Sequence, residues 1–406
     1  MAVELEWVEG GGVTTPLGWR AGAAYAGVRT YGEEPRYDVG ILVSEFPASV
    51  AGIFSRNAVV GAPIRYNRPR VATGRARGIV ANSGNANTVT GEQGDRDAAR
   101  MAELAARQAG VEVEEMLVAS TGVIGRLLPM EQIEAGITSV RPSVDGGPLF
   151  TRAIMTTDTV AKHRAVRVTC EGRTYTVGGT AKGSGMVHPD MATVFCFLTM
   201  DAPCEIEWLR RTLREVGDVS INMIDVDMDS STSDTMLLFA NGAAGGEVID
   251  AAHPASQPLR AAIEALAIAL ARDLARDGEG ARTLIEVTVE GAATREDARK
   301  AARTVTSSPL VKTMVTGRDA NLGRVLMAVG RSGARVEVER ASVWIGEHCA
   351  FEQGVPTDVE YSVISKAMEA EEVTIRVELG LGEERATAWG CDLTEDYVRI
   401  NADYTT

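Results

Sequence analysis

Short runs rich in valine and isoleucine alternate with helical patterns along the whole chain of 406 residues. Runs bounded by turn-forming residues predict strands at Gly40–Ser44, Gly52–Ser55, Gly78–Asn82 and Val194–Met200. Apolar residues at three- and four-residue spacing predict helices over Glu92–Ala109, Glu205–Val216 and Gln257–Arg276. Glu171-Gly172 separates two more strand-like runs, Ala165–Cys170 and Arg173–Val177, as in a two-residue hairpin turn. This order predicts a mixed α/β fold whose sheets are not purely parallel.

The last third of the chain repeats the alternation. Strands are expected at Leu284–Glu290, Arg335–Glu339 and Val373–Leu379. The long helical pattern before them ends in Asp277-Gly278-Glu279-Gly280. Because glycines commonly follow the end of a helix, we expect a domain boundary near Gly278–Arg282.

Composition excludes several classes of protein. The net charge of −15 argues against a nucleic-acid binder, which needs a basic surface. Residues 1–12 show no signal-peptide pattern, and the most apolar helical stretch, Ala261–Ala271, is too short to cross a bilayer. Five scattered cysteines suit a reducing compartment and do not suggest disulfides. The four histidines are also scattered, so no metal centre is expected. We therefore expect a cytoplasmic protein with no nucleic-acid or membrane partner.

The most unusual segment runs from Gly178 to Thr193, where four glycines surround Lys182. Glycine-rich turns can bind phosphate through their backbone N–H groups. The spacing here matches neither a P-loop nor a dinucleotide-binding motif, and a strand rather than a helix is expected to follow. Lys182 is also one of few lysines in a chain that mostly uses arginine, which suits a compact ammonium group as well as a solvated loop charge.

Thr193 is a candidate nucleophile in the same segment. A threonine hydroxyl needs an adjacent base, and cleavage of the preceding bond would supply one as the freed α-amino group. The pKa of such a group, about 7.7–8.0, suits a general base near neutral pH. The small Ala192 and the turn at Pro189 are compatible with self-cleavage. A threonine that merely begins a buried strand is the structural alternative.

Four other polar clusters are candidates for a site. Thr121 and Gly122, within Ala119–Gly125, could present a hydroxyl and an N–H to an oxyanion. The other clusters are Asn82–Asn87, Asp277–Gly280 and Asn401–Thr406. Each also has a purely structural interpretation: a turn, a helix cap and a frayed tail, respectively.

Together these motifs resemble the ornithine acetyltransferase family, the glutamate N-acetyltransferases of the cyclic arginine pathway. Lys-Gly-Ser-Gly-Met at Lys182–Met186, followed by Pro-x-Met-Ala-Thr at Pro189–Thr193, is highly specific in combination. The resemblance covers nearly the whole chain, through the segments Gly12–Pro16, Asn82–Asn87, Thr90–Gly94, Ser120–Gly125, Met155–Thr159, Asp277–Ala281 and Asn401–Thr406.

This resemblance implies a self-cleaving enzyme. The precursor would be cut between Ala192 and Thr193 into an α chain, 1–192, and a β chain, 193–406, associated as an (αβ)₂ heterotetramer. The implied fold is an N-terminal-nucleophile-like αββα core over 1–280. A smaller C-terminal α/β domain over 281–406 would close the active site.

The implied reaction is ping-pong acetyl transfer from N-acetylornithine to glutamate through acetyl-Thr193. Thr121 and Gly122 match the oxyanion hole, and no metal or organic cofactor is implied. Some members also use acetyl-CoA, and no residue decides whether this chain does. The residues that match substrate contacts are Thr157, Lys182, Thr193, Glu279, Asn401 and Thr406, with Thr156 and Thr159 as alternatives to Thr157.

Several positions depart from the family pattern. Leu322 and Ala320 stand where Trp and Pro are expected, Asp190 where Asn is common, and Arg282-Thr283 where Thr-Lys is usual. Loss of a tryptophan can reshape a pocket, so a different acyl donor or acceptor in secondary metabolism is an alternative. A self-cleaving amidase or aminopeptidase, and an inactive binding protein, are the rival classes.

Overall fold

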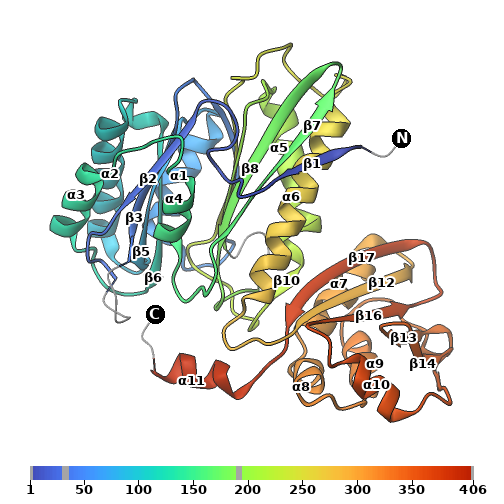
Figure 1. The fold of residues 1–406 in the computed structure, drawn as a ribbon. Helices are drawn as coiled ribbons and strands as arrows, with labels where there is room; N and C mark the ends of the chain where they lie inside the picture. The colour runs from blue at the N-terminus through green and yellow to red at the C-terminus, as the bar shows by residue number, and fades with distance from the viewer. Residues whose placement is uncertain (1–2, 30–35, 189–193, 404–406) are drawn as a thin grey trace.

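The structure is a computed structural model, and it describes residues 3–29, 36–188 and 194–403. Two sheets face each other in the N-terminal part, and a third lies beside them (Figure 1). The first sheet contains, in spatial order, β1 (Leu5–Val8), β7 (Lys162–Cys170), β8 (Arg173–Lys182), β9 (Phe195–Met200), β11 (Thr235–Ala240) and β4 (Ser49–Phe54). The second contains β2 (Trp19–Ala24), β3 (Val39–Ser44), β5 (Gly78–Asn85) and β6 (Met116–Val123).

Helices cover the outer faces of these two sheets. The second sheet packs on α1 (Ala62–Ala72), α2 (Gly91–Ala109) and α3 (Met130–Ser139). The first packs on α5 (Ile206–Val219) and α6 (Ser256–Arg276). These layers form the αββα arrangement predicted from the resemblance, so the predicted fold class is confirmed.

The inner faces of the two sheets share an apolar core. Leu42 and Ile79 of the second sheet belong to the same buried cluster as Phe197 and Phe239 of the first. The short helix α4 (Gly147–Ile154) contacts strands of both sheets and contributes Phe150, whose ring lies 6.0 Å from that of Phe197. The buried aromatic rings hold the two sheets in a defined relation, which positions side chains at the ends of their strands.

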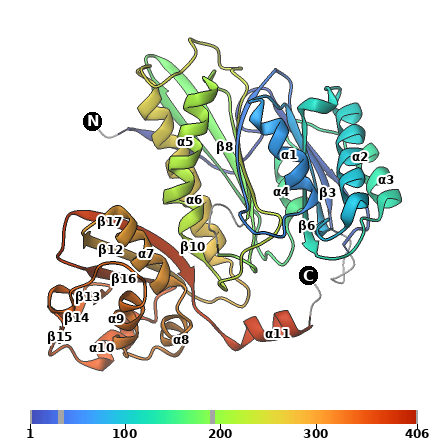
Figure 2. The ribbon, with the colours of Figure 1, turned by 180° about the vertical axis from the view of Figure 1, so that it is seen from behind.

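The third sheet is built mainly from the last part of the chain. In spatial order its strands are β10 (Ile224–Asp225), β17 (Glu384–Cys391), β12 (Leu284–Ala292), β16 (Glu372–Glu378), β13 (Ser342–Ile345), β14 (His348–Glu352) and β15 (Val355–Pro356). The remaining helices are α7 (Arg295–Thr306), α8 (Pro309–Gly317), α9 (Gly323–Gly330), α10 (Tyr361–Ala367) and α11 (Glu395–Asp403). Seen from behind, α11 extends from this part back towards the first two sheets (Figure 2).

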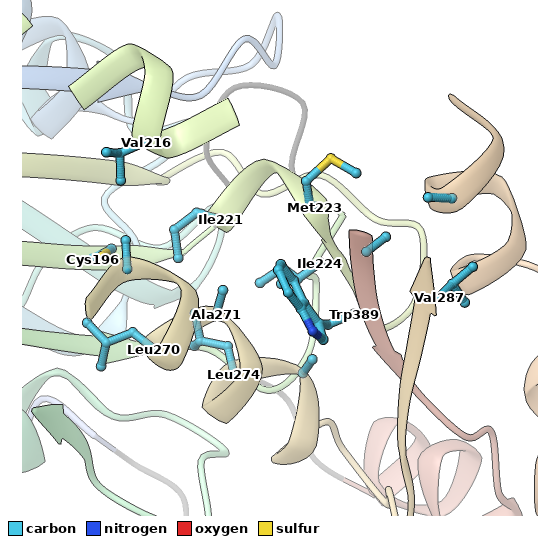
Figure 3. Packing of buried hydrophobic residues seen from close by; sticks show 14 of the residues in the cluster. Cys196, Val216, Ile221, Met223, Ile224, Leu270, Ala271, Leu274, Val287 and Trp389 are labelled. Carbon is cyan, nitrogen blue, oxygen red and sulfur yellow. The ribbon is translucent and has the colours of Figure 1, made fainter. Parts of the chain in front are cut away.

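The hydrophobic core continues into this third sheet. Leu274 of α6 lies beside Ile224 and Trp389, so α6 contacts both parts of the molecule (Figure 3). The predicted boundary at residue 281 falls between the end of α6 and the start of β12. In the part of the chain that the structure describes, no helix combines the length and apolar character needed to cross a membrane.

Two sequence-based expectations differ from the structure. Arg335–Glu339 is not a strand, because no strand among the described residues pairs with it. The Arg335 N–H donates to Asp297 of α7, and Val338–Arg340 form a 3₁₀ turn. Gly178 and Gly179 do not lie in a loop but inside β8. A Cβ on Gly178 would lie 2.1 Å from the Gly12 oxygen, so these glycines permit close packing against β8.

Candidate active site

Six of the predicted site residues line one pocket at the ends of strands from both facing sheets. They are Thr121, Gly122, Thr157, Lys182, Glu279 and Asn401. Val194, which directly follows Thr193 in the chain, lines the same pocket. Ala192, Thr193 and Thr406 lie outside the described residues, as does Asp190. The pocket is therefore assembled from segments that are far apart in the sequence.

Thr121 and Gly122 lie at the end of β6, paired in parallel with Ser83 and Gly84 of β5. Gly122 has φ +128°, and a Cβ at this position would lie 2.4 Å from the carbonyl carbon of Gly84. Only glycine fits this conformation and this close approach. The two strands thus bring the Thr121 hydroxyl and the backbone of Gly122, which carries no side chain of its own, to the pocket wall.

Lys182 ends β8, and its Nζ donates a hydrogen bond to Thr121 Oγ1 over 3.1 Å. Its side chain is buried, and burial lowers the pKa of Lys182, while the carboxylates of Asp158 and Asp234 act in the opposite direction. Within the described residues, one carboxylate oxygen of the buried Asp234 has no hydrogen-bond partner. Burial raises the pKa of Asp234 well above its usual range.

A second polar group surrounds Glu279. Its Oε1 accepts a hydrogen bond from Thr157 over 2.6 Å, and its Oε2 accepts one from Asn401 over 2.7 Å. Ser184 contacts the Thr157 hydroxyl at 2.7 Å, and a Cβ on Gly185 would lie 2.4 Å from the Glu279 carboxyl carbon. The carboxylate is held from both sides and keeps lone pairs that can accept hydrogen bonds from an ammonium group.

Among the three neighbouring threonines, only Thr157 contacts Glu279 in the described residues. The Thr159 hydroxyl donates instead to Asp277. Thr156 lines the pocket, and its backbone N–H donates to Asp158. The geometry therefore favours Thr157 over Thr156 and Thr159 as the residue paired with Glu279.

A buried ionic network behind the pocket was missed by sequence reasoning. Lys162 Nζ donates to Asp158 over 2.7 Å and also to Asp277, which ends α6. Burial alone would raise the pKa of Asp158, but the Lys162 and Lys182 cations outweigh it and lower this pKa to about 2. Asp158 also accepts the Gly183 N–H over 2.8 Å, so the network supports the segment that follows Lys182. The sequence suggested Asp277 as a helix cap or as part of a site, whereas the structure pairs it with Lys162, more than a hundred residues away.

The departures from the family pattern that fall on described residues, Ala320, Leu322, Arg282 and Thr283, lie away from the described lining of the pocket. Leu322 is buried in the core beneath the third sheet. Arg282 pairs with Asp396 of α11 over 2.9 Å. Within residues 3–29, 36–188 and 194–403, no cluster of three or more His, Cys, Asp or Glu side chains could hold a metal ion.

The αββα layers and the pocket at the ends of their strands define an N-terminal-nucleophile-like fold. A model of the ArgJ family matches residues 20–406. The arginine biosynthesis bifunctional protein ArgJ of Symbiobacterium thermophilum is 49% identical over 99% of this chain and 100% of its own length. Its namesake from Bacillus subtilis is 42% identical over 98% of this chain and 97% of its own. The chain belongs to the ArgJ family, which confirms the resemblance.

A solved structure also matches. The crystal structure of arginine biosynthesis bifunctional protein ArgJ from Bacillus halodurans shares 40% identity with a TM-score of 0.50. The match covers 51% of this chain and 98% of that chain. The solved chain is thus about half as long as the present one.

Proposed function

We propose that this enzyme of arginine biosynthesis transfers an acetyl group from N2-acetylornithine to glutamate. The observation that carries the proposal is the convergence of six motif-matched side chains and backbone groups on one pocket, beside Val194. The names of the relatives from Symbiobacterium thermophilum and Bacillus subtilis, bifunctional proteins of arginine biosynthesis, support the same conclusion.

The nucleophile in this proposal is Thr193, freed by self-cleavage. One water molecule adds across the Ala192–Thr193 peptide bond, which leaves a carboxylate on Ala192 and an α-amino group on Thr193. The half-length solved chain from Bacillus halodurans is what one product of such a cut would look like. The freed amino group then acts as the base that Thr193 Oγ needs.

In the first half-reaction, Thr193 Oγ attacks the acetyl carbonyl and its proton passes to the α-amino group. The developing oxyanion is stabilised by the Thr121 hydroxyl and the Gly122 N–H. Collapse of the intermediate transfers the proton to the leaving ornithine and leaves acetyl-Thr193. In the second half-reaction the glutamate amino group attacks this ester, and N-acetylglutamate departs as Thr193 Oγ regains its proton.

The charged side chains of the pocket suit amino-acid substrates. We assign the Glu279 carboxylate, held by Thr157 and Asn401, to a substrate ammonium group. Lys182 is assigned to a substrate carboxylate, and Thr406 completes the set. Ornithine and glutamate share an amino-acid frame, so one pocket can bind them in turn.

The reaction needs no metal or organic cofactor in this proposal. Acetyl-CoA is proposed as a second acetyl donor, because the relatives are named bifunctional. An assay with acetyl-CoA and glutamate tests this part separately. Formation of N-acetylglutamate would support acetyl-CoA as a donor, and absence of this product would rule it out. We also propose an (αβ)₂ heterotetramer in the cytoplasm, which light scattering and cell fractionation would test.

The main test mixes the purified protein with N-acetylornithine, with and without glutamate. We expect ornithine and N-acetylglutamate in equal amounts, with little ornithine released when glutamate is absent. Equal release with and without glutamate would instead identify an amidase. Transfer only to or from other amino acids would favour the secondary-metabolism alternative. Thr193→Ala is the matched control and should lose both cleavage and turnover.

A further inference from the structure

One short segment, Asp225–Thr235, holds the chain on both sides of the proposed cleavage bond. On the upstream side, the Val226 N–H donates to the Val187 oxygen over 2.7 Å. On the downstream side, the Thr235 N–H donates to the Val194 oxygen over 3.0 Å. The two hydrogen bonds therefore bracket residues 188–193 from both ends.

The upstream side is held by additional side chains of the same segment. Asp227 accepts the N–H groups of Met186 and Val187 over 2.6 and 2.9 Å. The Ser230 hydroxyl donates to the His188 oxygen over 3.0 Å. Val187 and Ser230 also form an isolated antiparallel bridge. Backbone groups at the three consecutive positions 186–188 are thus paired.

The His188 ring adds an anchor to the C-terminal part of the molecule. Arg303 of α7 lies 3.2 Å from His188 Nε2, and because arginine can only donate, this nitrogen accepts. Nδ1 then donates to Asp225 Oδ1 over 2.7 Å. Asp225 is itself buried and paired with Lys312 of α8 over 2.9 Å. Lys312 also donates to the Val226 and Cys391 oxygens, so the anchor point is rigid.

We propose that Asp225–Thr235 acts as a clamp that positions the Ala192–Thr193 bond for self-cleavage, with His188 as its upstream positioning residue. This inference rests on the proposed cleavage. Attack of the Thr193 hydroxyl on the adjacent carbonyl requires a bent backbone. Because the folded chain is already anchored on both sides of the bond, it loses less conformational entropy when it reaches that geometry.

The two sides of the clamp have different roles after the cut. The upstream anchor then holds the end of the α chain, which contributes no nucleophile. The downstream bond from Thr235 still holds Val194, the residue next to the nucleophile. Loss of the upstream anchor should therefore slow maturation while leaving turnover by matured enzyme unchanged.

The test follows conversion of freshly synthesised full-length chain into two chains on denaturing gels, and measures kcat per cut molecule. His188→Ala removes the anchor while Lys312 still neutralises Asp225, and we expect cleavage to slow roughly tenfold at an unchanged kcat. His188→Asn should restore cleavage, because its Nδ2 can donate to Asp225 from nearly the position of Nδ1. His163→Ala is the matched control, since His163 also uses Nδ1 for one hydrogen bond, to the Gly11 oxygen of another region.

The outcomes separate the clamp from the cleavage on which it rests. A wild-type chain that never cuts contradicts the proposed maturation itself. If the wild-type chain is cut and His188→Ala is cut equally fast, the clamp proposal is overturned and the proposed self-cleavage stands. If His188→Ala does not fold, the exposed Ser230→Ala variant decides: slower cleavage supports the clamp, and cleavage at the wild-type rate overturns it.

Discussion

Lys182 donates a hydrogen bond to Thr121 across the junction of the two facing sheets, with 3.1 Å between Nζ and Oγ1. Lys182 ends β8 of the first sheet, and Thr121 lies near the end of β6 of the second. Because an ammonium group only donates, the Thr121 oxygen must accept this bond, which leaves the hydroxyl hydrogen free to donate elsewhere. The contact therefore orients Thr121 as a donor for the pocket.

Replacing Thr121 tests that role. Thr121→Val removes the hydroxyl with little change of shape, so we expect kcat for acetyl transfer to fall about 10²–10³-fold, as for other lost oxyanion donors. KM should change little, because the donor acts mainly in the transition state. Thr121→Ser keeps the hydroxyl and should retain most of the activity. Equal losses in the two variants, measured by steady-state kinetics, would contradict the assignment.

Gly122 should tolerate no side chain. Gly122→Ala combines an unfavourable positive φ with a contact of 2.4 Å to Gly84, and we expect it to lower the free energy of unfolding by about 2–5 kcal/mol. The control is Gly110→Ala, where φ is also positive, at +69°, but no atom of the described residues lies within 4 Å of the added Cβ. Its cost should be only about 1–2 kcal/mol. Urea unfolding measures both, and equal costs would show that the close approach to Gly84 is unimportant.

Glu279→Gln should discriminate between the two substrates. N-acetylornithine carries its only cation on the side chain, whereas the glutamate side chain is an anion that Glu279 repels. The neutral variant should therefore raise KM for N-acetylornithine by roughly ten- to a hundredfold, whereas KM for glutamate should fall because the repulsion is removed. Initial rates with each substrate varied in turn provide the measurement. A parallel rise in both values would remove Glu279 from the recognition of the side chain.

The sequence predicted the layers well where local patterns decide the structure. The helix expected over Gln257–Arg276 occurs as Ser256–Arg276, because its apolar residues recur on one face that packs against β7 and β8. Arg335–Glu339 alternates like a strand, yet alternation cannot reveal whether a partner strand exists. The glycines of β8 suggested a loop. They are needed instead for close packing against segments such as Gly12, which lie far away in the sequence and which no local pattern indicates.

The site shows the same division. Motif resemblance named Thr121, Lys182 and Glu279, and the structure brings all three to one pocket. The resemblance gave no information about the ionic network behind these residues, in which Lys162 joins Asp158 to the distant Asp277. The Lys162–Asp277 pair depends on tertiary packing, and no local spacing in the sequence indicates it. The roles of the site residues stay predictions until variants are measured.

The Asp158–Lys162 pair predicts how stability depends on pH. The pKa of Asp158 is about 2 in the folded protein, below its usual value of 3.8. The unfolded chain therefore binds more protons between these pH values, so the stabilisation is complete above about pH 4 and is lost as the pH falls towards 2.

Asp158→Asn provides the measurement of this effect. Near neutral pH it leaves Lys162 with one carboxylate fewer, and we expect a loss of about 3–5 kcal/mol. The difference in unfolding free energy between wild type and variant should shrink by about 2 kcal/mol as the pH falls from 4 to 2. Urea titrations at several pH values give this difference. A difference that stays constant over that interval would show that the pKa of Asp158 is the same in the folded and the unfolded protein.

The most direct test of the account is intact-mass spectrometry under denaturing conditions, after the protein meets N-acetylornithine without glutamate. We predict two chains, 1–192 and 193–406, with one acetyl group on the second chain that disappears when glutamate is added. The Thr193→Ala variant should remain one uncut and unacetylated chain. An uncut wild-type chain that still produces N-acetylglutamate, or a cut enzyme that turns over without acetylation of the second chain, would contradict the central claim that Thr193 is the acetyl-carrying nucleophile.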